Sequence, residues 1–185
     1  RLTEKMSVLT DSGKLESGSE IVFVDDGSKD GTWELIEKYR LEFESVEGIK
    51  LSRNRGHQNA LFAGLMTVKD GFDAVVSMDA DLQDDIDAVD EMLEKYDGGC
   101  DIVYGVRKSR KKDSVFKRTT AVLFYKMMRW MGAETVYNHA DYRLMSRRAL
   151  DALENFGEVN LFLRGLVPLI GFKSDTVYYD RGSRF

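Results

Sequence analysis

Two clusters of acidic residues stand directly after apolar runs, and their spacing suits the binding of a divalent cation. Asp25 and Asp26 follow one run, and Asp79 and Asp81 follow another. Close carboxylates repel, so such a cluster stays ionised at neutral pH only with a cation nearby. One or two carboxylates with open coordination positions suit Mg²⁺ or Mn²⁺ bridging a substrate diphosphate.

Simpler roles compete with this interpretation. Asp25, Asp26 and Ser28 also favour a turn followed by a helix cap, and Asp85 is expected only to cap the next helix. In extended backbone, however, residues two apart project to the same side, so Asp79 and Asp81 can share one metal and its phosphates. A metal-diphosphate site is therefore the sharper prediction.

The elements that must position these residues are short strands. Residues 21–24, 74–78 and 102–104 are apolar runs rich in Val and Ile, which predict buried strands. Residues 48–52 and 176–179 are weaker strand candidates.

Segments with helical periodicity separate the strands. We expect helices at 32–39, with Leu35, Ile36 and Tyr39 on its inner face, at 57–69, and from Ile86 to Tyr96. The β-α-β-α-β order predicts an α/β fold with a doubly wound, mostly parallel sheet and helices on both faces. Ligands bind outside the carboxyl ends of such strands, so both acidic clusters are expected at one edge.

Length and composition indicate one globular domain over residues 1–185, with 43% apolar residues. The single cysteine, Cys100, excludes an internal disulfide and favours a reducing, cytoplasmic setting. No apolar run approaches the roughly 20 residues of a membrane-spanning helix, and residues 1–5 do not resemble a signal peptide. We therefore expect this chain neither to span a membrane nor to be exported.

The formal net charge of −5 conceals an uneven distribution. Residues 1–105 carry 11 Lys and Arg against 24 Asp and Glu, net −13, while residues 106–148 carry 12 against 3, net +9. A basic segment in an acidic protein commonly faces an anion, such as a phosphorylated substrate, a nucleic acid or a membrane surface. A solvated loop is the alternative for residues 107–112, and residues 114–131 suit either a core helix or an interfacial one.

Other classes of α/β protein fit less well. A phospho-acceptor receiver domain would be shorter and would leave the basic segment unexplained. No Gly-x-Gly-x-x-Gly follows a strand and no Gly-x-x-x-x-Gly-Lys-Ser/Thr loop occurs, which argues against Rossmann and P-loop proteins. His57 and His139 lack the spacing of metal ligands and are expected to be structural.

Four longer motifs stand in a fixed order along the chain. They are Val24-Asp25-Asp26-Gly27-Ser28-Lys29-Asp30-Gly31-Thr32, Ser52-Arg53-Asn54-Arg55-Gly56-His57-Gln58, Asp79-Ala80-Asp81-Leu82-Gln83-Asp84 and Asp141-Tyr142-Arg143-Leu144-Met145. In this order they resemble the motifs of the family-2 glycosyltransferases of GT-A fold. Within that family the sequence is most similar to the polyprenyl-phosphate glycosyltransferases, the group that includes dolichol-phosphate mannose synthase and bactoprenol glucosyltransferase.

The resemblance implies a role for each matching position. Asp81 and Gln83 would engage Mg²⁺ or Mn²⁺ on the diphosphate. Asp141 would be a base or orienting carboxylate on the acceptor side, and Arg107 and Arg143 would grip a lipid phosphate. Asp81, Asp141 and Arg143 are thus the expected catalytic residues. The nucleotide would be bound by Asp25, Asp26, Arg53, Asn54, Gly56 and Asp79.

The sequence also departs from the family pattern. An opening strand with Pro-x-Tyr-Asn-Glu-Glu is absent, and residues 1–19 are expected as the tail of the following helix and a polar loop. The family's Gln-Asp-Pro-Pro is Gln83-Asp84-Asp85-Ile86 here, which predicts a less rigid turn, and Ala140 replaces a glycine. Residues 106–148 are expected as the basic acceptor-side segment.

The resemblance implies inverting transfer of a hexose from a UDP- or GDP-sugar to a polyprenyl phosphate, in cell wall or glycan biosynthesis. The expected location is the cytoplasmic face of an anionic membrane, with the full-length protein anchored by C-terminal helices outside this chain. Transfer to a polysaccharide or another acceptor is one alternative. A non-catalytic module that binds a nucleotide sugar or a membrane surface is another. No nucleic-acid partner is expected, and a homo-oligomer is left open.

Overall fold

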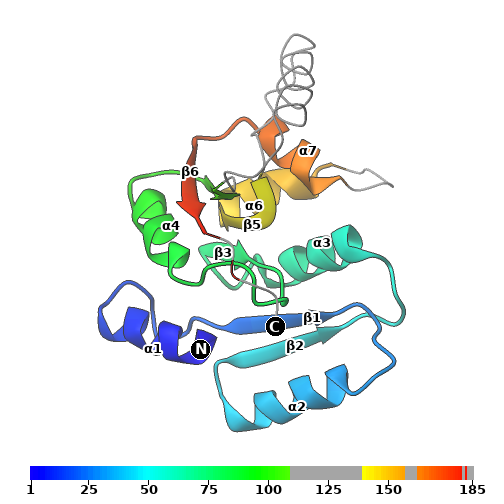
Figure 1. Cartoon of the computed structure of the whole chain (residues 1–185). Helices are drawn as coiled ribbons and strands as arrows, with labels where there is room; N and C mark the ends of the chain where they lie inside the picture. Colours follow the sequence, from blue (N-terminus) through cyan, green and yellow to red (C-terminus); the bar gives the residue numbers. More distant parts are fainter. Residues whose placement is uncertain (109–138, 157–161, 181, 183–185) are drawn as a thin grey trace. The chain divides into compact units, whose positions relative to one another are not determined.

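The structure is a computed structural model that describes residues 1–108, 139–156, 162–180 and 182. The chain divides into two compact units, residues 1–73 and 74–185, and each combines helices with strands (Figure 1). The predicted α/β class is confirmed. The helix candidate at 114–131 and most of the basic segment lie outside the described residues. The single domain expected over residues 1–185 stays a prediction.

The first unit contains a parallel pair of strands, β1 and β2, in which Phe23 lies opposite Gly48. Both strands were predicted, β2 only as a weaker candidate. Helix α1 lies within residues 1–19, where helix and a polar loop were expected, and its being the tail of a helix that follows an opening strand stays a prediction. The elements of this unit are α1 (Leu2–Asp11), β1 (Ile21–Asp25), α2 (Thr32–Glu42), β2 (Val46–Lys50) and α3 (His57–Val68).

Two glycines let helices approach opposite faces of this strand pair. A Cβ added to Gly48 would lie 2.7 Å from Cγ2 of Ile36 on α2, and a Cβ added to Gly64 on α3 would lie 2.6 Å from Cγ2 of Val24. Gly48 is paired with Phe23, whose side chain faces the opposite way from that of Val24. Helix α2 therefore covers one face and α3 the other.

The second unit contains a four-stranded sheet in the order β3-β5-β4-β6. Strand β4 pairs in parallel with β6, whereas β5 runs antiparallel to both β3 and β4. Strand β5 was not predicted, because Asp141 and Arg143 interrupt its apolar pattern. The elements are β3 (Ala74–Ser77), α4 (Ala88–Asp97), β4 (Ile102–Arg107), β5 (His139–Ser146), α6 (Arg147–Glu154), α7 (Leu163–Leu169) and β6 (Ser174–Tyr179).

Helices pack on this sheet and create the core of the second unit. Helix α4 contacts β4 and β6, while α6 and α7 contact β5 (Figure 1). The central strands β4 and β5 are buried along most of their described length. The most deeply buried apolar side chains of this unit include Met92, Ile102, Val103, Leu144, Met145, Leu150, Leu153 and Leu163.

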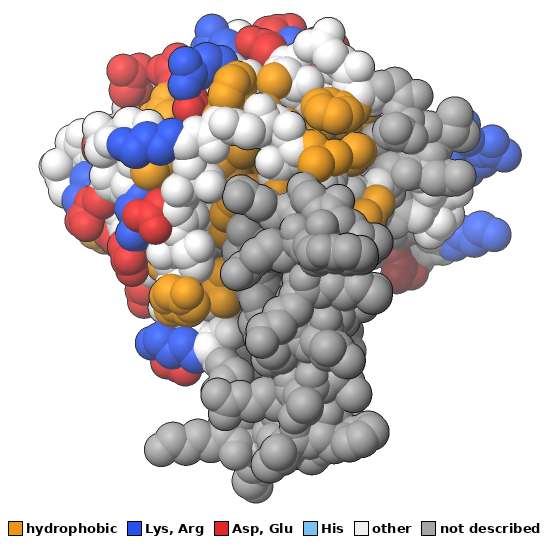
Figure 2. Space-filling model, turned by 90° about the horizontal axis from the view of Figure 1, so that it is seen from above, with side chains coloured by type: hydrophobic (Ala, Val, Ile, Leu, Met, Phe, Trp, Pro, Cys, Tyr) orange, Lys and Arg blue, Asp and Glu red, His pale blue; other side chains and the backbone are white. Residues whose placement is uncertain are grey.

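Some apolar side chains remain at the surface, and Figure 2 shows such side chains on one face of the molecule. Phe162 and Leu169, at the two ends of α7, are both exposed. Across the described ranges, we find no helix of sufficient length and apolar character to cross a bilayer.

Candidate active site

The end of β1 places two carboxylates in different environments. Asp25 is 3% exposed; its Oδ1 accepts a hydrogen bond from the backbone N–H of Ser28 at 3.1 Å, whereas its buried Oδ2 has no hydrogen-bond partner. Asp26 instead accepts hydrogen bonds from the backbone N–H groups of Arg55, at 2.6 Å, and Gly56, at 2.9 Å. A buried acceptor without a donor is costly, so Oδ2 of Asp25 is suited to a donor on a ligand.

The loops that follow β1 and β2 lie against each other. Gly27 has φ +70°, and a Cβ added there would lie 2.6 Å from the backbone carbonyl carbon of Arg53. Arg53 and Asn54 are exposed on the second loop, and Gly56, with φ +85°, leads into α3. The structure thus brings together the nucleotide residues expected in the first unit, while Asp79 lies in the second.

The loop between β3 and α4 carries the second acidic cluster. Oδ1 of Asp81 accepts a hydrogen bond from the backbone N–H of Gln83 at 3.1 Å, which turns the loop back on itself. Between them, Leu82 has φ +60°, an uncommon conformation for a residue with a side chain. Asp79 and Asp81 are partly exposed and Gln83 is buried. The expected ligands of the diphosphate and its metal therefore share one short loop.

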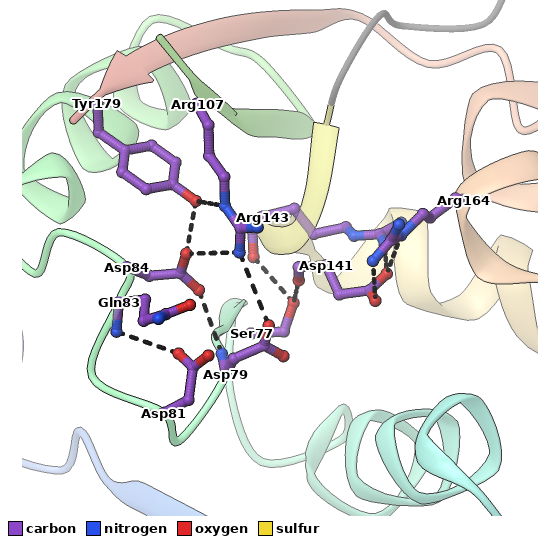
Figure 3. A network of polar contacts seen from close by, with 10 residues as sticks. All are labelled: Ser77, Asp79, Asp81, Gln83, Asp84, Arg107, Asp141, Arg143, Arg164 and Tyr179. Carbon is purple, nitrogen blue, oxygen red and sulfur yellow. Dashed lines mark hydrogen bonds and ion pairs between the residues drawn. The ribbon is translucent and has the colours of Figure 1, made fainter. Parts of the chain in front are cut away.

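The carboxylate of Asp84 ties this loop to two strands (Figure 3). Its Oδ1 accepts hydrogen bonds from the hydroxyl of Tyr179 at 2.5 Å and from Nη2 of Arg107 at 3.2 Å. Its Oδ2 accepts one from the backbone N–H of Asp79 at 3.3 Å. Nη2 of Arg107 also lies 3.8 Å from Oδ2 of Asp79. In this structure Arg107 thus contacts Asp84 and lies near Asp79, and its expected role on a lipid phosphate stays a prediction.

Asp141 on β5 is buried between two arginines (Figure 3). Its Oδ1 accepts hydrogen bonds from Nη2 of Arg143 at 2.7 Å and from Nε of Arg164 at 3.3 Å, and its Oδ2 from Nη2 of Arg164 at 3.0 Å. Ser77, at the end of β3, donates its hydroxyl to the carbonyl oxygen of Asp141 at 2.5 Å. Asp141 is thereby fixed next to β3, the strand that leads into the acidic loop.

The two arginines differ in exposure. The side chain of Arg143 is 2% exposed, whereas that of Arg164 is 46% exposed. Burial lowers the pKa of Arg143, although the charge of Asp141 opposes this shift. The hydrogen bond to Asp141 raises the pKa of Arg164. Arg143 is thus turned toward Asp141 rather than presented to solvent, and Arg164 is the cation of this group that solvent reaches.

Burial also raises the pKa values of two tyrosines of the second unit. It raises the pKa of Tyr104 to about 12. For Tyr179, burial raises the pKa above its usual range, and the hydrogen bond to Asp84 adds to this effect. The Tyr179 phenol is therefore neutral at physiological pH and donates a hydrogen bond to Asp84.

The acidic loop offers donor atoms that fit Mg²⁺ or Mn²⁺. Asp79 and Asp81 provide carboxylate oxygens and Gln83 an amide oxygen, which these cations prefer. Within the described residues, no three or more His, Cys, Asp or Glu side chains are grouped as a complete metal site. Mg²⁺ is commonly held by one or two carboxylates together with substrate phosphates, and this loop fits that mode.

Two residues of this site, Arg164 and Tyr179, were not predicted from the sequence. Arg164 belongs to none of the four motifs, and Tyr179 stood only in a weak strand candidate. Their contacts with Asp141 and Asp84 depend on the packing of α7 and β6. The meeting of both acidic clusters at one sheet edge stays a prediction, since Asp25 and Asp26 belong to the first unit and Asp79 and Asp81 to the second.

Comparison with known proteins identifies the family. The model of glycosyl transferase family 2 matches residues 9–154. This chain therefore belongs to glycosyl transferase family 2, as its motifs indicated.

The relatives include an uncharacterized glycosyltransferase and a transferase with a named acceptor. The chain is 54% identical over its full length to an uncharacterized glycosyltransferase of Bacillus subtilis, YkoT, and covers 55% of that protein. It is 38% identical over 89% of its length to the bactoprenol glucosyl transferase of Shigella phage SfV, of which it covers 53%. The chain thus spans about half the length of these relatives.

Solved structures share the fold at low sequence identity. Glucosyl-3-phosphoglycerate synthase from Mycobacterium tuberculosis matches 90% of this chain and 61% of its own, with a TM-score of 0.56 and 18% identity. Staphylococcus aureus TarS, residues 1–349, matches 93% of this chain and 55% of its own, with a TM-score of 0.56 and 15% identity. These likenesses confirm the predicted GT-A fold.

Proposed function

We propose that the protein is an inverting glycosyltransferase that moves a hexose from a UDP- or GDP-sugar to a polyprenyl phosphate. The observation that carries this proposal is the 38% identity to a bactoprenol glucosyl transferase across 89% of the chain. The second unit supports it, because it combines the acidic loop with the buried Asp141 and its arginines.

The nucleotide of the donor would be bound by the residues that the motifs predicted. Oδ2 of Asp25 would accept a hydrogen bond from the nucleotide base or ribose, because it is a buried acceptor that needs a donor. Asp26 would act indirectly, since its carboxylate fixes the backbone of Arg55 and Gly56. Arg53, Asn54 and Asp79 would complete the nucleotide contacts.

Asp81 and Gln83 would hold a divalent cation on the diphosphate. A neighbouring structure of glucosyl-3-phosphoglycerate synthase, 16% identical with a TM-score of 0.50, was solved with Mn²⁺, UDP-glucose and phosphoglyceric acid. When bound, the cation would neutralise negative charge on the departing diphosphate. Asp81 is expected to bind it through its carboxylate, while the hydrogen bond from Gln83 keeps that carboxylate oriented.

On the acceptor side, a phosphate oxygen would attack the anomeric carbon as the bond to the nucleoside diphosphate breaks, which inverts the configuration. A phosphate monoester has a second pKa of about 6 and is largely ionised at pH 7, so its oxygen needs little help from a base. Asp141 would orient rather than deprotonate, since both its oxygens accept hydrogen bonds from guanidinium groups.

The three arginines near these carboxylates would then have separate roles. Arg143, buried against Asp141, would position that carboxylate. Arg164 and Arg107, which are partly exposed, would be available to the acceptor phosphate or the departing diphosphate. The basic residues 106–148 would bring the protein to an anionic membrane where the lipid acceptor resides.

A transfer assay tests this proposal. The protein is incubated with radiolabelled UDP-glucose or GDP-mannose, Mn²⁺ and undecaprenyl phosphate, and label is counted in the organic phase; undecaprenol without phosphate is the control. We expect label in lipid only with the phosphorylated acceptor. Transfer to a polysaccharide but not to this lipid would favour the alternative acceptor. Nucleotide binding without transfer to either would favour a non-catalytic module.

A further inference from the structure

Two tyrosine hydroxyls, one from β5 and one from β6, hold the turn that follows the acidic loop. Tyr179 on β6 donates to Oδ1 of Asp84 at 2.5 Å, and Tyr142 on β5 donates to the carbonyl oxygen of Asp85 at 2.8 Å. The two rings pack edge to face with centroids 5.2 Å apart. Two consecutive residues of the turn are therefore attached to one aromatic pair.

The three hydrogen bonds of the Asp84 side chain are all donated to its carboxylate. The Asp84 side chain is 1% exposed, and its three partners, the Tyr179 hydroxyl, the Arg107 guanidinium and the Asp79 backbone N–H, are all donors toward it. Nε of Arg107 also donates to the Tyr179 oxygen at 3.1 Å, which leaves the phenol proton for Asp84. Asp84 thus accepts three hydrogen bonds, two at Oδ1 and one at Oδ2, and its carboxylate is held on both sides.

This arrangement fixes the acidic loop at both ends. Oδ2 of Asp84 holds the backbone of Asp79 at the start of the loop. The carbonyl oxygen of Gln83, at its end, accepts a hydrogen bond from the backbone N–H of Gly182 at 3.0 Å. Asp81 lies between these two points. The loop and the turn after it contain no proline, since the only proline of the chain is Pro168. Their backbone is therefore held by these hydrogen bonds and not by a fixed proline φ angle.

We propose that Asp84 and Tyr179 are positioning residues that preset the loop of residues 79–83 for a metal-bound nucleoside diphosphate. The inference rests on the proposed function and assigns these two residues a role beyond it. The carboxylate and the phenol do not touch the diphosphate; they act by holding Asp79 and the loop in the binding conformation. A preorganised loop avoids the entropy cost of ordering upon binding, so loss of the anchor weakens binding.

Tyr179→Phe and Tyr178→Phe form a matched pair for the test. Both remove one hydroxyl from strand β6, but Tyr178 is 61% exposed and points away from Asp84, since neighbouring side chains alternate along a strand. The dissociation constants of UDP and of GDP with Mn²⁺ are measured by calorimetry on the 185-residue chain, well below the unfolding temperature. We expect Tyr179→Phe to weaken binding about 5- to 10-fold, the size expected for one buried hydrogen bond, and Tyr178→Phe to leave it unchanged.

Hydrogen exchange of the metal-free protein gives a second measurement, independent of nucleotide and metal. The backbone amides of Asp79 and Gln83 should exchange faster in Tyr179→Phe than in Tyr178→Phe, because the loop opens more often. Asp84→Asn should have a larger effect on both measurements, since no orientation of an amide accepts from three donors.

Three results would overturn the inference. Equal nucleotide affinity in Tyr179→Phe and the unaltered chain would do so while leaving the proposed function intact. Unchanged exchange at Asp79 and Gln83 would likewise exclude a positioning role. Failure of the unaltered chain to bind either nucleotide with Mn²⁺ would remove the proposed function itself, and the inference with it.

Discussion

At the scale of single residues, the carboxylates of the site are of two kinds: some are exposed to solvent, and others are buried and paired with arginines. Asp81 is partly exposed and accepts a hydrogen bond from one backbone N–H group. Its carboxylate can therefore still contact a cation. Asp141 is buried and held by two guanidinium groups. Substitution at Asp81 should therefore cost much less unfolding free energy than substitution at Asp141.

Asp81→Ala should abolish transfer without unfolding the protein. The side chain is partly exposed, and its loss removes one hydrogen bond to a loop amide, which costs about 1 kcal/mol of unfolding free energy. The transfer rate is measured beside the thermal unfolding midpoint, and Asp87→Ala, an exposed carboxylate at the start of α4, is the control. Normal turnover in Asp81→Ala would contradict a role in metal binding.

Asp141→Asn should destabilise the protein strongly, because it leaves the buried guanidinium of Arg143 without its counter-ion. Breaking a buried pair typically costs about 3–5 kcal/mol of unfolding free energy. Arg164→Gln removes only the partly exposed partner and should cost less than about 1 kcal/mol. Denaturant unfolding of both variants measures the difference. Equal losses would mean that Arg143 does not depend on Asp141 for its charge balance.

At the scale of elements, patterns of apolar residues predicted strands better than they predicted buried faces. Runs rich in Val and Ile located β1, β3 and β4, because a buried strand requires such side chains on both faces. Strand β5 escaped, since a buried ion pair replaces part of its apolar pattern. On α2, Ile36 is buried as expected, but Leu35 and Tyr39 are exposed, because the first unit offers only two described strands to cover.

For the site, too, the sequence predicted residues within one segment better than contacts between segments. Motifs identified Asp79, Asp81 and Gln83, which share one loop and are therefore adjacent in the sequence. Arg164 and Tyr179 come from separate elements, and only the folding of α7 and β6 onto the sheet brings them to Asp141 and Asp84. Contacts between distant segments carry no local signal in a single sequence.

The contact between the loops after β1 and β2 predicts the effect of Gly27→Ala. Gly27 and Gly13 have similar φ values, +70° and +73°, so alanine costs about 1–2 kcal/mol at either position from backbone strain alone. At Gly27 the new Cβ would also meet the backbone of Arg53 at 2.6 Å, whereas nothing lies within 4 Å at Gly13.

Gly27→Ala should therefore lose about 1–3 kcal/mol more unfolding free energy than Gly13→Ala, the usual cost of overpacking. It should also weaken UDP or GDP binding, because the two loops must separate. Chemical denaturation and calorimetry check both effects. Identical stability of the two variants would show that the loops move apart without cost.

At the scale of the whole molecule, the uneven charge distribution predicts where the protein binds. Residues 1–105 carry a net charge of −13 and residues 106–148 a net charge of +9, so overall the chain is acidic while one segment is strongly basic. An anionic bilayer attracts nearby Lys and Arg by about 1 kcal/mol each, and this attraction fades within a Debye length of about 10 Å at 0.1 M salt. Membrane attachment through this segment should therefore be specific for anionic lipid and sensitive to salt.

Sedimentation with vesicles tests this prediction. The chain should bind phosphatidylglycerol vesicles and not phosphatidylcholine vesicles, and 0.5 M salt should release it. Replacing Arg110, Lys111 and Lys112 by Gln should reduce binding by about 100-fold at low salt, given about 1 kcal/mol for each charge. Replacing the exposed Lys14, Lys29 and Lys38 by Gln changes the net charge equally but lies in the acidic half. If both triple variants lost binding to the same extent, net charge rather than the basic segment would govern attachment, and the proposed approach to a lipid acceptor through residues 106–148 would be wrong.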